Sequence, residues 1–297
     1  MSEAVATVQV KQEPTPGIAV SGTVPIVTII VLILLLYARI GTKLVTDWYE
    51  LPDFSHGFLI PFFAAYLLWE RRKQIRQVES RPSWTAVPLV LLSLVVLMVG
   101  IFGADLFLAR ISFILLSAGL VWLLAGIQLL RIVGFPIAIL ILGVPLPAVV
   151  FNQMTFPLQI LASQLAAALL PLAGVPVLRE GNVINLPSMQ LEVAEACSGI
   201  RSMMSLFTVA VLFGYFFEEK GFRRFLLALC SVPIAVAANA LRIFGTGVCV
   251  QYWNPDKAVG FFHEFSGWLM FLVSLACLYL VHFATRSLGR RRVSSPA

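Results

Sequence analysis

Three reactive side chains of this sequence lie in unusual surroundings, and the first is Cys197. It lies in EACSGIRS, between a polar and an apolar stretch, and is therefore expected at the N-terminus of a helix. A helix N-terminus and the nearby Arg201 both favour the thiolate, which is the nucleophilic form of cysteine. The pattern predicts a reactive cysteine; the alternative is a small packing residue beside Gly199.

The second is Arg242, which lies in AANALRIFG within an apolar run. A permanently charged side chain is costly inside a membrane unless it has a partner or a function. Asn239 precedes Arg242 by three residues and shares its helix face, so we expect Asn239 to orient the guanidinium by a hydrogen bond. The alternative is that Arg242 extends to the membrane surface.

The third is His263, which lies in GFFHEFSGW at the start of the last apolar run. Histidine is suited to proton transfer near neutral pH. A cysteine nucleophile, a histidine and an arginine that holds a developing oxyanion are the groups needed for acyl transfer through a thioester. Glu195 either orients His263 or lies in water. His282, at the other end of the same run, is expected at the membrane interface.

The elements that position these residues must lie in lipid. Of the 297 residues, 59% are hydrophobic and only 12% are charged, and a soluble core cannot bury so much apolar surface. Apolar runs near the roughly 20 residues that cross a bilayer recur along the chain. We predict an all-α polytopic membrane protein with about eight spans, near 24–40, 56–70, 84–102, 106–126, 132–150, 200–217, 224–249 and 265–284.

The distribution of charge predicts which side of the membrane each loop and tail occupies. The net charge of +6 comes from short basic clusters beside the apolar runs, which is typical of cytoplasmic loops and does not favour nucleic-acid binding. We predict a flexible cytoplasmic tail at 1–22, a single transmembrane domain at 23–285 and a basic cytoplasmic tail at 286–297. The predicted reactive residues then fall on the external side.

Two segments between the predicted spans are exceptions. Residues 153–173 are apolar, but counting them as a span would reverse the charge pattern downstream, so we expect an interfacial helix there. Residues 175–196 alternate apolar and polar residues around the turn signal Glu180-Gly181-Asn182. They predict a short external β-hairpin directly before the cysteine.

No metal or organic cofactor is expected. The four cysteines are far apart and form no CxxC pair, and no glycine-rich phosphate loop follows a strand.

With EACSGIRS at 195–202, NALRI at 239–243 and the His263 segment, the chain resembles the exosortase and archaeosortase family of membrane cysteine transpeptidases. The resemblance extends to GNVINLP before the cysteine and to SHGFLIP at 55–61. It implies that Cys197 is the nucleophile, with Arg242 and His263 as the second and third catalytic residues. His56 belongs to SHGFLIP and either lines the pocket or caps an interfacial segment.

The family resemblance also implies a substrate and a location. Its substrates are membrane-anchored proteins with a C-terminal sorting signal, which in bacterial exosortases is a Pro-Glu-Pro motif before a membrane span and a basic tail. The enzyme would lie in the bacterial inner membrane, with its site at the external face and a lipid or glycan as acceptor. Arg179 and Arg201 could meet the glutamate of the signal. The alternatives from other classes are a small transporter and a non-catalytic exopolysaccharide assembly factor.

Overall fold

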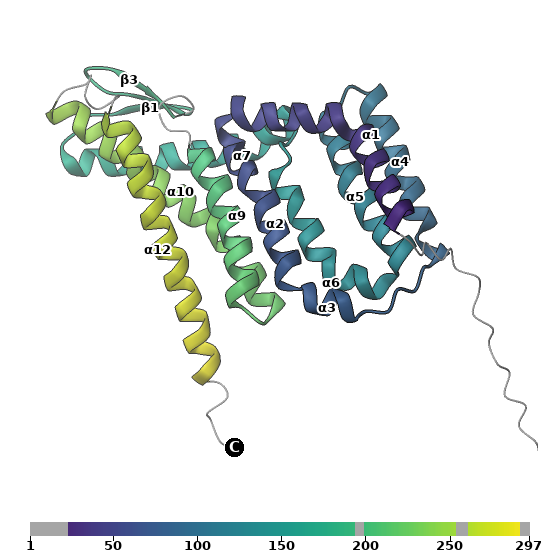
Figure 1. Ribbon diagram of the computed structural model, residues 1–297. Helices are drawn as coiled ribbons and strands as arrows, with labels where there is room; N and C mark the ends of the chain where they lie inside the picture. Colours follow the sequence, from purple (N-terminus) through teal and green to yellow (C-terminus); the bar gives the residue numbers. More distant parts are fainter. Residues whose placement is uncertain (1–22, 194–198, 254–260, 292–297) are drawn as a thin grey trace, which may run out of the picture. The chain divides into compact units, whose positions relative to one another are not determined.

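The computed structural model describes residues 23–193, 199–253 and 261–291, which are helical apart from one small sheet (Figure 1). The chain forms two compact units. The first contains residues 1–46 and 57–144, and the second contains residues 47–56 and 145–297. The predicted single domain at 23–285 remains a prediction.

The first unit is built from apolar helices. They are α1 (Thr23–Glu50, up to its last turn), α2 (Leu59–Glu70), α3 (Arg72–Gln77), α4 (Val87–Phe102), α5 (Leu106–Ala125) and α6 (Ile127–Ala138). Helices α4 and α5 form a tight hairpin, in which Asp105 caps α5 by accepting hydrogen bonds from the amides of Phe107 and Leu108. A Cβ at Gly100 would stand 2.5 Å from the amide nitrogen of Ala109, so only glycine allows this approach.

The second unit carries every residue that the sequence singled out for chemistry. It contains the 3-10 helix η1 (Pro52–Phe58, up to His56), α7 (Ala148–Leu169), the 3-10 helix η4 (Leu170–Ala173), α9 (Gly199–Phe217), α10 (Gly221–Tyr252) and α12 (Phe261–Arg291). Helices α9, α10 and α12 pack against one another, and α7 packs against α10. Leu206 of α9, Leu227 of α10 and Leu278 of α12 share a buried core.

A three-stranded antiparallel sheet follows α7 and η4 in the second unit. Its strands are β1 (Leu178–Glu180), β2 (Val183–Asn185) and β3 (Gln190–Glu192), in that spatial order. The predicted hairpin is β1–β2. Gly181 opens its two-residue turn with a φ of 65°, which glycine adopts without strain.

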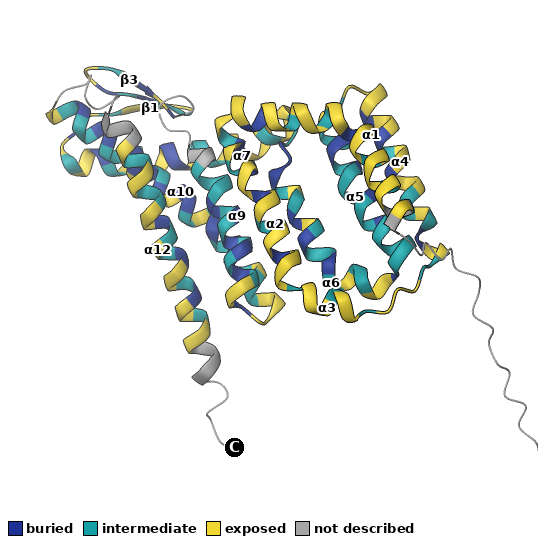
Figure 2. Ribbon diagram, viewed as in Figure 1, coloured by how far each residue is buried: buried dark blue, intermediate teal, exposed yellow. Residues whose placement is uncertain are grey.

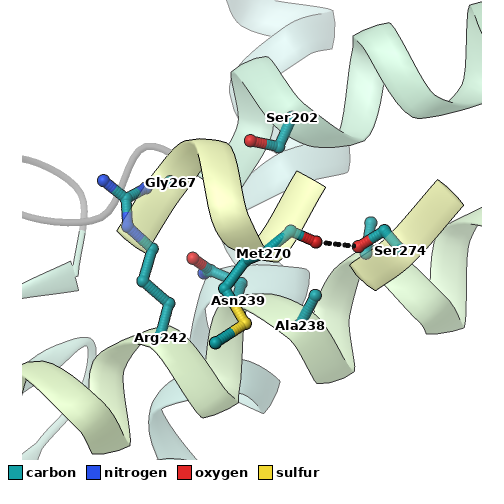
Figure 3. Close-up of a pocket in the computed structure, with 8 residues that line it drawn as sticks. Ser202, Ala238, Asn239, Arg242, Gly267, Met270 and Ser274 are labelled. Atoms are coloured by element: carbon teal, nitrogen blue, oxygen red, sulfur yellow. Dashed lines mark hydrogen bonds between the residues drawn. The ribbon is translucent and has the colours of Figure 1, made fainter. Parts of the chain in front are cut away.

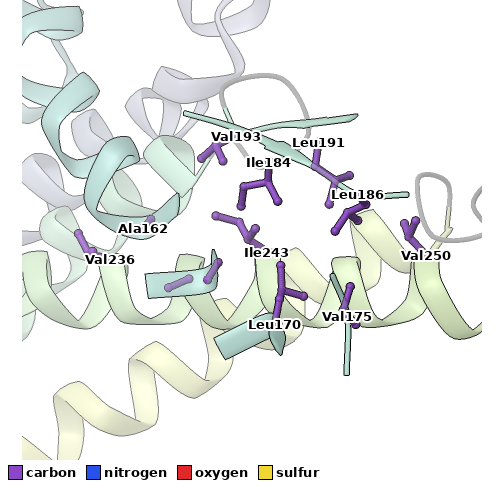
Figure 4. Packing of buried hydrophobic residues seen from close by; sticks show 12 residues of the cluster. Ala162, Leu170, Val175, Ile184, Leu186, Leu191, Val193, Val236, Ile243 and Val250 are labelled. Carbon is purple, nitrogen blue, oxygen red and sulfur yellow. The ribbon is translucent and has the colours of Figure 1, made fainter. Parts of the chain in front are cut away.

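The inner face of this sheet covers α7 and α10 (Figure 4). Ile184 and Leu191 are buried against a cluster that includes Ala162 of α7 and Ile243 of α10. Because Ile243 follows Arg242 in the chain, the sheet lies over the stretch of α10 that carries the predicted catalytic arginine.

The expectation of an all-α polytopic membrane protein is confirmed. Among the described residues, six helices are long and apolar enough to cross a membrane: Val27–Glu50, Trp84–Phe102, Leu106–Ala125, Ala148–Ala173, Gly221–Tyr252 and Phe265–Ser287. Two apolar helices are shorter, Ile127–Gly143 and Ser202–Phe217. Exposed faces with large apolar side chains follow α1, α4 and α12, as expected of helices in lipid (Figure 2).

The middle of the chain is divided differently from the prediction. Instead of one span at 132–150, α6 continues into the 3-10 helix η3 (Ile139–Gly143), and the helical chain stops just before Pro145. Pro147 precedes α7, which thereby gains residues 148–152. With this extension α7 and η4 reach span length, so Ala148–Ala173 qualifies as a crossing helix where we predict an interfacial one. The number of spans and the sidedness stay predictions.

Candidate active site

Arg242 is the described residue around which the candidate site is built. It is buried in α10, with 7% of its surface exposed. Its side chain extends to α12, where the guanidinium lies against the backbone of Gly267 (Figure 3). A Cβ at position 267 would stand 3.2 Å from Nη2 and 3.3 Å from Cζ. Arg242 therefore turns inward between helices, which contradicts the alternative that it extends to the membrane surface.

A small cavity surrounds this guanidinium. Its volume is about 10 Å³, which is room for about one water molecule. Three helices line it: Ser202 from α9, Ala235, Ala238, Asn239 and Arg242 from α10, and Gly267, Met270 and Ser274 from α12. Apart from the polar groups of Ser202, Asn239, Arg242 and Ser274, the lining is apolar, so a charge that develops here would be stabilised by Arg242 with little screening.

Asn239 shares the cavity with Arg242, but the expected hydrogen bond to the guanidinium is wrong. The Oδ1 atom of Asn239 is buried and accepts no hydrogen bond within the described part of the chain. The spacing of three residues does bring both side chains to one face, yet Arg242 extends away to α12. Asn239 also lines a second cavity of about 20 Å³, together with Gln159 and Thr155 of α7 and Met203 of α9.

The segments that carry the two other predicted catalytic residues reach the same cavity. Cys197 and Glu195 lie outside the described residues, but the helix that begins two residues after Cys197 contributes Ser202. His263 belongs to the first turn of α12 and Arg201 to the first turn of α9, and both side chains lie outside the description. Position 263 precedes Gly267 by one helical turn, so the two positions share a face of α12.

The chain that carries these segments matches a known family. Residues 48–280 of the 297 match the transmembrane exosortase family. The chain belongs to this family. Comparison with the curated proteins and with the solved structures gave no match. Membership supports a general role in membrane protein sorting by transpeptidation, in a family that is generally cysteine transpeptidase-like.

His56 of this exosortase lies in η1 and is not among the residues that line these two cavities. It is half-buried and lies with its ring centroid 6.3 Å from that of Phe54. Phe54 in turn packs against Phe151 of α7 at 5.4 Å. These contacts pack η1 against the start of α7, and both interpretations of His56 stay predictions.

Arg179 of the exosortase lies on β1, where its guanidinium donates a hydrogen bond to the carbonyl oxygen of Gly181. The bond holds the side chain across the hairpin turn. A role for Arg179 in meeting the substrate remains a prediction.

The structure adds two features that the residue pattern did not identify. Gly267 makes room for Arg242, and the only signal was a small residue one turn after His263. The second is a buried pair at the other end of α12, where Nδ1 of His282 lies 2.8 Å from Oε1 of Glu218. Arg223 lies 3.6 Å from the second oxygen of that carboxylate. His282 is therefore buried in the helix cluster, and its expected depth at the membrane interface stays a prediction.

Proposed function

We propose that this exosortase is a cysteine transpeptidase that cleaves the C-terminal sorting signal of membrane-anchored proteins at the external face of the bacterial inner membrane. The observation that supports this most is the buried Arg242 guanidinium, at a cavity where α9 and α12 also meet. These are the helices whose first residues follow Cys197 and include His263.

In the proposed reaction, the Cys197 thiolate attacks the carbonyl carbon of the scissile peptide bond, and a carbon–sulfur bond forms. Arg242 stabilises the oxyanion, because a guanidinium stays charged and donates hydrogen bonds but does not give up a proton. His263 gives a proton to the leaving amine as the carbon–nitrogen bond breaks. The thioester carries the substrate on the enzyme.

The second half of the reaction releases the substrate. An amine or hydroxyl on a lipid or glycan acceptor attacks the thioester, its proton passes to His263, and the cysteine leaves as the thiolate. If water were the acceptor, the same residues would act as a protease. Glu195 and Arg201 are proposed as supporting residues, since they flank the nucleophile in the chain.

Co-expression with a tagged, membrane-anchored substrate that carries a Pro-Glu-Pro signal tests the proposal. We expect the wild type to shorten the substrate on a gel and Cys197→Ala to leave it intact. Cys249→Ala is the matched control, because this free cysteine packs with the core under the sheet. Processing retained in an inserted Cys197→Ala variant would contradict the proposal and favour a transporter or an assembly factor.

A further inference from the structure

Among the described residues, the outer edge of β3 has no neighbouring strand, so its outward amide and carbonyl groups have no strand partner there. The spatial order β1-β2-β3 makes β3 an edge strand. Leu191 of β3 pairs with Ile184 of β2. The amide of Val193 donates to the carbonyl of Asn182, and the amide of Leu186 donates to the carbonyl of Met189.

These two bonds define which backbone groups of β3 point outward. In an antiparallel pair, residues that exchange hydrogen bonds alternate with residues that do not. Positions 189, 191 and 193 therefore point their amide and carbonyl groups at β2, while Gln190 and Glu192 point theirs away from it. Within the described residues, no hydrogen bond occupies these outward groups of Gln190 or Glu192.

The edge is also close to the proposed nucleophile. Glu192 precedes Cys197 by five residues, a stretch of chain that spans at most about 18 Å. On its inner face the sheet packs on Ile243, the neighbour of Arg242 in α10. A strand laid along β3 would thus pair with residues that lie within seven positions of Cys197 in the chain, in a sheet that packs on the stretch of α10 beside Arg242.

We propose that β3 binds the protein substrate by strand addition: an extended segment beside the scissile bond pairs with the outward amide and carbonyl groups of Gln190 and Glu192. This inference rests on the proposed function and specifies how its substrate is held. Main-chain pairing at a sheet edge is a general way to bind an extended peptide, and a protease needs its peptide extended for attack.

The side chains of the outer face indicate which segments fit best. Glu180, Val183 and Glu192 pair across the three strands, so both carboxylates lie on the same face of the sheet. That face is exposed at both glutamates. At the substrate position that pairs with Glu192, we therefore expect Lys or Arg to bind better than Asp or Glu. Opposite charges stabilise a cross-strand pair, and like charges destabilise it.

The test compares Glu192→Pro with Glu192→Ala in the purified, detergent-solubilised enzyme, using a synthetic peptide that spans the sorting signal. Both variants remove the carboxylate, but only proline removes the outward amide, and proline is tolerated at a sheet edge. We expect Glu192→Pro to lower kcat/KM roughly three- to ten-fold relative to Glu192→Ala, mainly through KM, which is the loss of about one hydrogen bond. The two melting temperatures should agree.

A second measurement keeps the test independent of folding. Methylation of single peptide nitrogens should impair cleavage by the wild type at every second position, since alternate amides of an added strand point at β3. Equal kcat/KM for the two variants, or no alternation along the peptide, would overturn the strand-addition proposal. An inactive Cys197→Ala variant would still support the proposed cysteine transpeptidase. A change from dimer to monomer in Glu192→Pro with unchanged kcat/KM would instead assign the edge to a second copy of the chain.

Discussion

The guanidinium of Arg242 lies against Gly267, so that a Cβ at position 267 would stand 3.2 Å from Nη2. Alanine at this position would push the guanidinium by a few tenths of an ångström. We expect Gly267→Ala to lower kcat roughly ten-fold or more, because misplaced catalytic groups lose rate steeply. Gly245→Ala on α10 is the control, since nothing lies within 4 Å of its added Cβ. Similar kcat values for the two variants would contradict this role of Gly267.

Replacement of Arg242 tests oxyanion stabilisation directly. Arg242→Gln keeps a hydrogen-bond donor without the charge, and Arg242→Lys keeps the charge without the planar guanidinium. We expect both to reduce single-turnover cleavage roughly 10²- to 10³-fold, the usual cost of one oxyanion donor. Thioester formation measured by mass spectrometry locates the loss in the first step. Wild-type rates in both variants would remove Arg242 from the chemistry.

Replacement of Asn239 is expected to affect activity without lowering the stability of the protein. Its Oδ1 is buried without a hydrogen bond among the described residues, which costs about 1 to 3 kcal/mol. Asn239→Leu should therefore leave the melting temperature unchanged or raised, while cleavage falls if the amide faces substrate. Gln159→Leu is the matched control, because Gln159 lines only the second cavity. A lower melting temperature for Asn239→Leu would show that the amide is satisfied in the folded protein.

The pair of Glu218 and His282 is predicted to carry stability. His282→Ala removes the hydrogen bond to Oε1 of Glu218 and leaves this buried carboxylate with Arg223, 3.6 Å from its other oxygen, so we expect the protein to lose about 1 to 3 kcal/mol of stability. The exposed pair Arg81 and Glu79, at 3.1 Å, is the control and should contribute less than about 1 kcal/mol. Thermal unfolding in detergent measures both. Equal losses at the two sites would contradict the buried pairing.

The sheet should be held by its inner face. Ile184 is fully buried under it, whereas Leu178 is 62% exposed. We expect Ile184→Ala to cost about 2 to 5 kcal/mol and Leu178→Ala less than about 1 kcal/mol, because only the first opens a cavity. Limited proteolysis of the 178–193 region reports this difference. Equal protection of both variants would show that the sheet does not depend on this contact.

Helix breaks and turns in this fold are predictable from single residues and their neighbours in the sequence. The prolines at 145 and 147 mark the break before α7, and Gly181 marks the hairpin turn, because backbone limits act on the residue itself. The start of α7 was less accessible to prediction, since residues 148–152 suit either neighbouring helix. Apolar runs placed α9 and α10 within three residues of their observed bounds, whereas α12 extends beyond its predicted span at both ends.

Contacts between distant segments could not be predicted in this way. Arg242 is predictable as a costly charge, but its inward direction depends on Gly267, which belongs to another helix. Glu218 and His282 are 64 residues apart in the chain, and neither neighbourhood indicates the other. The site is thus predictable by residue type, while its geometry comes from helix packing.

Helix α12 connects the two ends of this packing. Gly267 and His282 are 15 residues apart, which is about 22 Å along a helix and within about 60° around its axis. One side of α12 therefore contacts Arg242 through Gly267 and, about 22 Å along the helix, Glu218 through His282. A rotation of α12 about its axis that moved Gly267 away from Arg242 would also move His282 away from Glu218. A substitution at Glu218 or His282 is therefore expected to lower the rate of catalysis, although neither residue contacts Arg242.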